Sequence, residues 1–126
     1  MIQLEHDFIV ERPARECLLF AADPRRRPEW DPSVLSVRKL SAGGPIAGSR
    51  FEITRALGSN RLSLRCTLET LDPPHHAELH GVGEGIHIID HIRCTALGEQ
   101  RTRVHWQTDI DLQRGERLLR PLLRRQ

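Results

Sequence analysis

Three ionisable side chains occupy positions in predicted strands that otherwise hold apolar residues. The clearest is Asp90, which interrupts the alternating apolar row of the stretch "GIHIIDHIRCTA". His6 and Arg55 interrupt the rows of two other strands in the same way. A carboxylate among apolar walls can act as a general base, with a cation or an imidazole stabilising the developing oxyanion. The same groups can instead orient the polar end of a bound molecule.

The registers of two neighbouring hairpins predict that Asp90 is buried. A two-residue turn at 84–85 pairs Leu79 with Asp90, and a three-residue loop at 98–100 pairs Asp90 with Thr108. Both registers keep the apolar rows on one face, so we expect Asp90 at mid-sheet on the covered face. An ionised carboxylate in that position needs hydrogen-bond donors or a cation.

Three side chains are candidates to meet the Asp90 carboxylate. Thr108 is its cross-strand neighbour, at roughly 5 Å between Cβ atoms. Strand spacing places His6 about 10 Å away and Arg55 about 14 Å away on a flat sheet. We therefore expect the three ionisable groups to surround a mostly apolar hollow without a direct salt bridge. The alternative is a core acid satisfied by Thr108 or a buried water, with Arg55 reaching solvent near a strand end.

The elements that must position these residues follow from periodicity and turn signals. The segment "PARECLLFAAD" predicts a short helix, whereas "PRRRPEWDP" is too rich in proline to continue it, so we expect a turn or a single helical turn around Trp30. The segment "RGERLLRPLLRRQ" predicts a final amphipathic helix that Pro121 kinks. The predicted strands cover residues 2–10, 34–40, 49–57, 60–71, 75–83, 86–97 and 101–112.

Together these elements predict an α+β fold, in which the helices gather on one face of a long antiparallel sheet. We expect one domain that spans residues 1–126. A chain of this length buries roughly two-thirds of the surface that its unfolded form exposes. Such a chain can therefore build a core that contains a ligand cavity.

The composition argues against several other classes of protein. The 19 basic residues nearly balance the 17 acidic ones, so nucleic-acid binding is not expected and the arginines at 25–27 are expected to face solvent. The cysteines lack C-x-x-C spacing, which indicates reduced thiols. The absence of a leader or of ~18 consecutive apolar residues indicates a cytoplasmic protein without a membrane span. No cofactor motif is present, and we expect no metal at the conceivable surface set of Glu78, His80 and His91.

Several segments of the chain resemble a known family. They are "FIVERPARECLLFAADPRRRPEWDPSVLSV", "GSRFEI", "LDPPHHAEL", "DHIRCTALGEQRTRV" and the leucine-rich final segment with its proline. These are similar to the polyketide cyclase/dehydrase-like branch of the START-like (SRPBCC) helix-grip superfamily. The resemblance covers nearly the whole chain.

The resemblance implies a seven-stranded curved antiparallel sheet, two short N-terminal helices and a C-terminal helix over an apolar cavity. Members of the superfamily include lipid and hormone carriers, aromatase/cyclases that act on poly-β-ketones, and chaperone co-factors, so the fold does not fix one function. This chain departs from the family in its final helix, which from Arg114 is at most ~20 Å long. We therefore expect an open cleft, or a homodimer whose second subunit completes the lid.

The favoured interpretation is a protein that binds a small hydrophobic or aromatic molecule between the sheet and the C-terminal helix, without a cofactor. One alternative is a polyketide cyclase or dehydratase that uses Asp90 as the general base and Arg55 or His6 as the oxyanion stabiliser. A second alternative is an interaction module for a protein or RNA partner. The other side chains expected to line the ligand are Phe8, Trp30, Phe51, Ile53, Leu64, Cys66, Leu79, Ile88, Ile92, Trp106, Thr108, Leu119 and Leu122.

Overall fold

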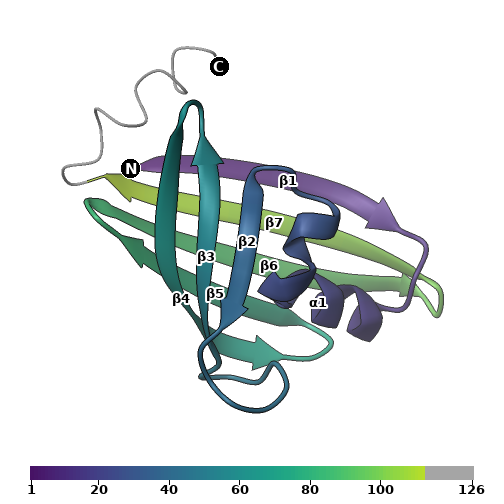
Figure 1. Cartoon of the computed structure of the whole chain (residues 1–126). Helices are drawn as coiled ribbons and strands as arrows, with labels where there is room; N and C mark the ends of the chain where they lie inside the picture. The colour runs from purple at the N-terminus through teal and green to yellow at the C-terminus, as the bar shows by residue number, and fades with distance from the viewer. Residues whose placement is uncertain (113–126) are drawn as a thin grey trace.

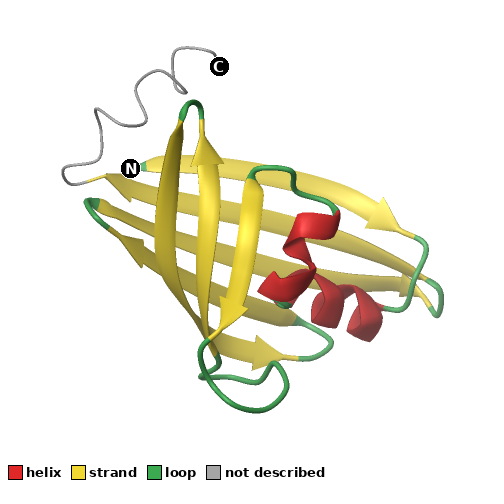
Figure 2. Cartoon of the chain, viewed as in Figure 1, coloured by secondary structure: helices red, strands yellow, loops and turns green. Residues whose placement is uncertain are grey.

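The computed structural model describes residues 1–112, which form one curved antiparallel sheet with two short helices against one of its faces (Figures 1 and 2). The predicted final helix, with Leu119 and Leu122, lies outside the described residues. The elements are β1 (Ile2–Val10), α1 (Ala14–Ala22), the 3-10 helix η1 (Pro24–Glu29), β2 (Val34–Lys39), β3 (Arg50–Leu57), β4 (Asn60–Asp72), β5 (His76–Gly83), β6 (Ile86–Gly98) and β7 (Arg101–Leu112).

The seven strands lie in the order β1-β7-β6-β5-β4-β3-β2, so the first strand closes one side by pairing with the last. In Figure 1, β2, β3 and β4 run steeply across the direction of β1, β7 and β6, which shows how strongly the sheet twists. This architecture confirms the predicted α+β class and agrees with the helix-grip fold that the family resemblance implies. The predicted pairing is also confirmed, because Asp90 lies between Leu79 on β5 and Thr108 on β7.

The hairpin between β6 and β7 has the predicted register but a different turn. The predicted three-residue loop at 98–100 is wrong, because Gly98 pairs with Arg101 across a two-residue turn. An irregularity between Ala96 and Gly98 takes up the extra residue, so Ala96 pairs with Thr102 and the alternation of faces is preserved. The bulge therefore leaves the placement of Asp90 unchanged.

The two short helices follow from the prolines and acids at their ends. The α-helix begins after Pro13 and ends at Asp23, whose carboxylate accepts a hydrogen bond from the backbone N–H of Arg25 at 3.1 Å and so caps η1. Leu18 is fully buried where α1 packs against β5, β6 and β7. No helix within residues 1–112 is long and apolar enough to cross a bilayer.

The core lies between the inner face of the sheet and α1. Its fully buried side chains include Leu18 from the helix and Phe51 and Leu68 from the strands. The buried inner-facing rows alternate with half-buried or exposed residues along β4 and β6, as expected for a sheet with one covered face. Toward β1 and η1, the same inner face borders open space instead of packed side chains.

Candidate functional site

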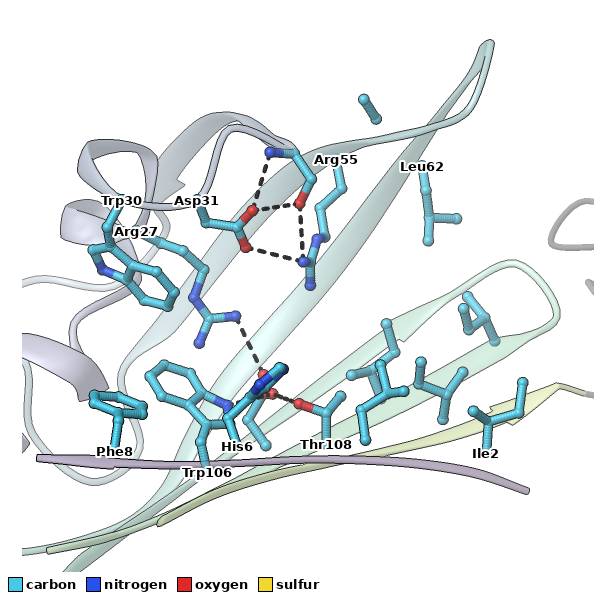
Figure 3. A pocket seen from close by; sticks show the side chains of 17 residues that line it. Ile2, His6, Phe8, Arg27, Trp30, Asp31, Arg55, Leu62, Trp106 and Thr108 are labelled. Carbon is cyan, nitrogen blue, oxygen red and sulfur yellow. Dashed lines mark hydrogen bonds and ion pairs between the residues drawn. The ribbon is translucent and has the colours of Figure 1, made fainter. Parts of the chain in front are cut away.

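The open space beside β1 is a hollow of about 550 Å³ on the inner face of the sheet (Figure 3). Its walls are mostly apolar, and its polar groups come from η1, from the turn that follows it and from four strands. This combination of size and lining is typical of small-molecule sites. The residues that line the hollow are Ile2, Leu4, His6, Phe8, Arg27, Trp30, Asp31, Ser33, Arg55, Ala56, Leu62, Ile86, Ile88, Asp90, Trp106, Thr108 and Ile110.

Asp90 is one of the two most enclosed charged groups of the hollow, with 4% of its surface exposed. Its Oδ1 accepts hydrogen bonds from the Thr108 hydroxyl at 2.7 Å and from the Trp106 indole N–H at 3.1 Å. Its Oδ2 accepts one from Nη1 of Arg27 at 3.3 Å. Burial acts to raise the pKa of Asp90, but the Arg27 charge and these hydrogen bonds outweigh it, so the pKa lies below its usual range. Asp90 is therefore an ionised carboxylate whose two oxygens are already engaged.

Arg27 is the counterion of Asp90, and the prediction that the arginines at 25–27 face solvent is wrong for it. Only 4% of Arg27 is exposed, because η1 turns it toward the sheet. Its guanidinium lies 5.0 Å from the ring centroid of Trp106 and 5.6 Å from that of Trp30, so two aromatic rings flank it.

The sequence contains a signal for this placement. In a 3-10 turn, residues three apart lie on the same side. Arg27 and Trp30 have this spacing, with Arg27 inside η1 and Trp30 as its C-cap. The second indication is Asp90, a predicted buried acid on the sheet that has no cation beside it in the predicted strands.

Arg55 also lines the hollow but pairs with a different acid. Its Nη2 donates to Asp31 at 3.2 Å and to the Ser33 hydroxyl at 3.1 Å, in the loop after η1. Burial lowers the pKa of Arg55, and the nearby positive charge of Arg27 lowers it further. Arg55 and Asp90 therefore line the same hollow but belong to separate ion pairs, Arg55 with Asp31 and Asp90 with Arg27.

His6 projects from β1 toward the hollow beside Trp106, the residue with which it pairs across the strands (Figure 3). Unlike Asp90, it is exposed to solvent. The structure thus brings His6, Asp90 and Arg55 to one hollow, at its rim, its floor and its opposite wall.

The other predicted ligand contacts divide into four groups. Phe8, Trp30, Ile88, Trp106 and Thr108 line the hollow. A much smaller void of about 10 Å³ lies beneath it, and among its lining residues are Ile53, Leu64, Cys66 and Leu79. Phe51 and Ile92 line neither space and are packed in the core, so for these two the prediction of a hollow-lining position is wrong. Leu119 and Leu122 lie outside the described residues.

Several lining residues were absent from the predicted set, although the alternating rows contain them. Ile2 and Leu4 precede His6 on the inner row of β1, and Ile110 follows Thr108 on β7. They line the hollow because the curved sheet brings β1 opposite η1. The apolar rows identify which face is inward, but the part of that face left uncovered depends on the curvature.

A second depression adjoins the hollow. This groove has a volume of about 1040 Å³ and runs between α1, η1 and the ends of β1 and β7. Phe8, Trp30 and Trp106 line both spaces. Trp30 meets Trp106 edge to face, with ring centroids 5.2 Å apart, so the tryptophan pair stands at the border between the hollow and the groove.

The conceivable metal set on the outer face, Glu78, His80 and His91, makes close contacts among its own members and with Asp109. His80 contacts Glu78 at 2.8 Å, and His91 lies 3.8 Å from Glu78 and 3.1 Å from Asp109. Within residues 1–112, no group of three or more His, Cys, Asp or Glu side chains is arranged to hold a metal ion.

Comparisons with known proteins agree with this architecture. The family model "Polyketide cyclase / dehydrase and lipid transport" matches residues 1–126. No curated protein sequence is significantly similar to the chain. Among solved structures, the Zhui aromatase/cyclase from Streptomyces sp. R1128 is similar with a TM-score of 0.69 and 18% identity, over 89% of this chain and 68% of that one.

Two further structures show the same fold in proteins with different names. Norcoclaurine synthase from Thalictrum flavum has a TM-score of 0.69 and 16% identity, over 96% of this chain and 82% of that one. A START superfamily protein from Mycobacterium smegmatis has a TM-score of 0.75 and 11% identity, over 94% of this chain and 84% of that one. The family model matches residues 1–126, so the chain belongs to the polyketide cyclase / dehydrase and lipid transport family.

Proposed function

We propose that this protein binds a small hydrophobic or aromatic molecule in the hollow between the sheet and η1. The observation that carries the proposal is the hollow itself: about 550 Å³, lined mainly by apolar side chains and bordered by Trp30 and Trp106. Ligand sites of drug-sized molecules span about 300 to 1,000 Å³ and have this composition. The polar groups on its walls are few, so their expected role is to fix the orientation of a ligand whose body contacts the apolar walls.

The alternative of a cyclase or dehydratase places the reaction in the same hollow, with Asp90 as the general base. One of the similar structures is an aromatase/cyclase and another is a synthase, so the fold occurs in enzymes. The contacts of Asp90 support it less well. A base must be free to accept a proton, whereas Asp90 accepts three hydrogen bonds and its pKa is lowered.

Binding in the hollow can be tested by filling it. Leu4 lines the hollow from β1, and Leu4→Trp adds a large side chain at that wall while the Asp90 residue itself is unchanged. Calorimetric titration with 2-naphthamide is expected to give saturable binding to the wild type and at least tenfold weaker binding to Leu4→Trp.

The matched control is Gln3→Trp, which adds the same side chain to the opposite, exposed face of the same strand. It is expected to leave the affinity within about threefold of the wild-type value. This change in binding free energy is smaller than the ~1.4 kcal/mol that corresponds to a tenfold change. Absence of saturable binding of both 2-naphthamide and 2-naphthoate to the wild type, or equal binding by both tryptophan variants, contradicts the proposal.

A homodimer that completes the site stays a prediction, as do a cytoplasmic location and the absence of nucleic-acid binding. The dimer is checked by the molar mass in solution, measured by light scattering with and without 2-naphthamide. A monomer that binds the amide with full affinity contradicts the need for a second subunit.

A further inference from the structure

The acceptors in the hollow are occupied, whereas many of its donors are not. Asp90 and Asp31 each accept three hydrogen bonds. Within residues 1–112, Arg27 donates one and Arg55 donates two. A guanidinium carries five N–H groups. The site therefore offers donors to a ligand and has few acceptors left for one.

The least satisfied of these donors is Nε of Arg27. It is a buried nitrogen with no hydrogen-bond partner among residues 1–112. The side chain that carries it is 5% exposed, so bulk water gives it little compensation. Buried donors are nearly always paired in folded proteins, and an unpaired one can be satisfied by an ordered water, an ion or a polar atom of a ligand.

The space between the two guanidinium groups suits a single small polar atom. The void of about 10 Å³ beneath the hollow is lined by Arg27, Arg55 and Asp90, and the hollow above it is lined by the same three residues. Such a volume holds about one water or one oxygen atom. Figure 3 shows both guanidinium groups pointing from the side of η1 and β3 toward the wall that carries His6 and Thr108.

Two cations, Arg27 and Arg55, and one carboxylate, Asp90, line the void, so the charge on its wall is net positive and favours an anion placed on the side of the guanidinium groups. Arg27 and Arg55 are close enough for the charge of one to lower the pKa of the other, and their carboxylate partners lie on different elements. An anionic oxygen between them gains two charge-assisted hydrogen bonds and relieves their repulsion. The flanking rings of Trp30 and Trp106 meanwhile favour an aromatic body for the same molecule.

We propose that the hollow selects a small aromatic molecule that bears a carboxylate or an equivalent anionic oxygen, and that this anion binds between Arg27 and Arg55. The proposal rests on the function proposed above and specifies the ligand class for that site. The aromatic body lies against the tryptophan pair, and the anionic oxygen reaches toward the void.

The test compares two probes that differ only in charge, 2-naphthoate and 2-naphthamide, by calorimetric titration near neutral pH. The wild type is expected to bind the naphthoate at least tenfold more tightly than the amide. Arg55→Gln removes one of the two cations and is expected to reduce this preference to less than threefold. Arg65→Gln, on the exposed outer face, is the matched control and is expected to keep the preference.

A third variant separates charge from folding. Asp31→Asn keeps the shape of the Arg55 partner and removes its negative charge, so the preference for the naphthoate is expected to increase. Thermal unfolding of each variant, compared with the wild type, establishes that it is folded. Opposite effects of Arg55→Gln and Asp31→Asn on the preference cannot arise from a common loss of structure.

The outcomes distinguish this inference from the function on which it rests. Equal affinity of the wild type for both probes overturns the anion proposal and leaves the aromatic site in place. A preference for the naphthoate that survives in Arg55→Gln places the anion elsewhere and also overturns it. Binding of neither probe contradicts the proposed function itself.

Discussion

The ion pair between Arg27 and Asp90 makes the floor of the hollow sensitive to the loss of either charge. The pair lies 3.3 Å apart, and both side chains are almost fully buried. Taking a charge out of water is costly, and a buried ion left without its partner destabilises the folded state by about 3–5 kcal/mol. Removing one member of the pair is therefore expected to destabilise the protein more than replacing both members by apolar residues.

We expect Asp90→Asn to lower the free energy of unfolding by about 3–5 kcal/mol, because it leaves the Arg27 cation buried without compensation. Urea unfolding measures the change. Asp90→Asn combined with Arg27→Met is expected to recover part of the loss, since no buried charge then remains. The control is Asp7→Asn, which breaks the exposed pair with Arg103 and is expected to have a much smaller effect. A double variant as unstable as the single one contradicts this account.

The pH dependence of stability follows from the same carboxylate. The pKa of Asp90 is lower in the folded state than the value of about 3.9 expected in the unfolded chain. Its ionisation therefore stabilises the fold fully above about pH 4, and this contribution is lost as the pH falls through the folded pKa. The difference in unfolding free energy between wild type and Asp90→Asn is expected to shrink in acid. A difference that stays constant from neutral pH into strong acid argues against an ionised Asp90.

At the scale of the elements, Thr102 ties β7 to the connection between β1 and α1. It is fully buried, and its hydroxyl donates to the carbonyl oxygen of Arg12 at 2.7 Å. The thiol of Cys17 approaches the same carbonyl at 3.7 Å, which is a weak contact. This tie holds the start of the helix against the sheet and so sets one edge of the groove.

We expect Thr102→Val to lower the free energy of unfolding by about 1–2 kcal/mol, because it retains the shape but leaves the Arg12 carbonyl with only a weak donor. Amide hydrogen exchange in α1 is expected to quicken more than exchange in β4. Thr95→Val, at an exposed position on β6, provides the comparison and is expected to change neither quantity appreciably. Uniformly faster exchange across the whole sheet counts against a local tie.

The strands were the predictable part of this fold, and the reason is their period of two. The alternating rows and short turns around Leu79, Asp90 and Thr108 specify two registers at once, so an error in one loop did not disturb the pairing. The position of Arg27 depends instead on the path of a proline-framed 3-10 turn and on the curvature that brings it over the sheet. Neither property has a periodic signal in the sequence.

For the molecule as a whole, the proposed function predicts that the hollow and the groove set the length of a ligand. Trp30 lines both spaces and is half exposed, so we expect its ring to limit how far a ligand in the hollow extends. Trp30→Ala is expected to join the two spaces and to raise the affinity for anthracene-2-carboxamide relative to 2-naphthamide by at least threefold. Trp30→Phe retains a ring and is expected to keep the wild-type ratio. An unchanged ratio in both variants shows that Trp30 does not limit ligand length.

The edge-to-face contact of Trp30 and Trp106 has a spectroscopic consequence. The chain contains 2 tryptophans and no tyrosine, and both tryptophans lie on the wall of the hollow. Practically all of the ultraviolet emission of the protein therefore originates at this one place. A molecule that enters the hollow changes the polarity around both indoles at once, and the wild-type protein reports its own occupancy as a shift in emission without any label.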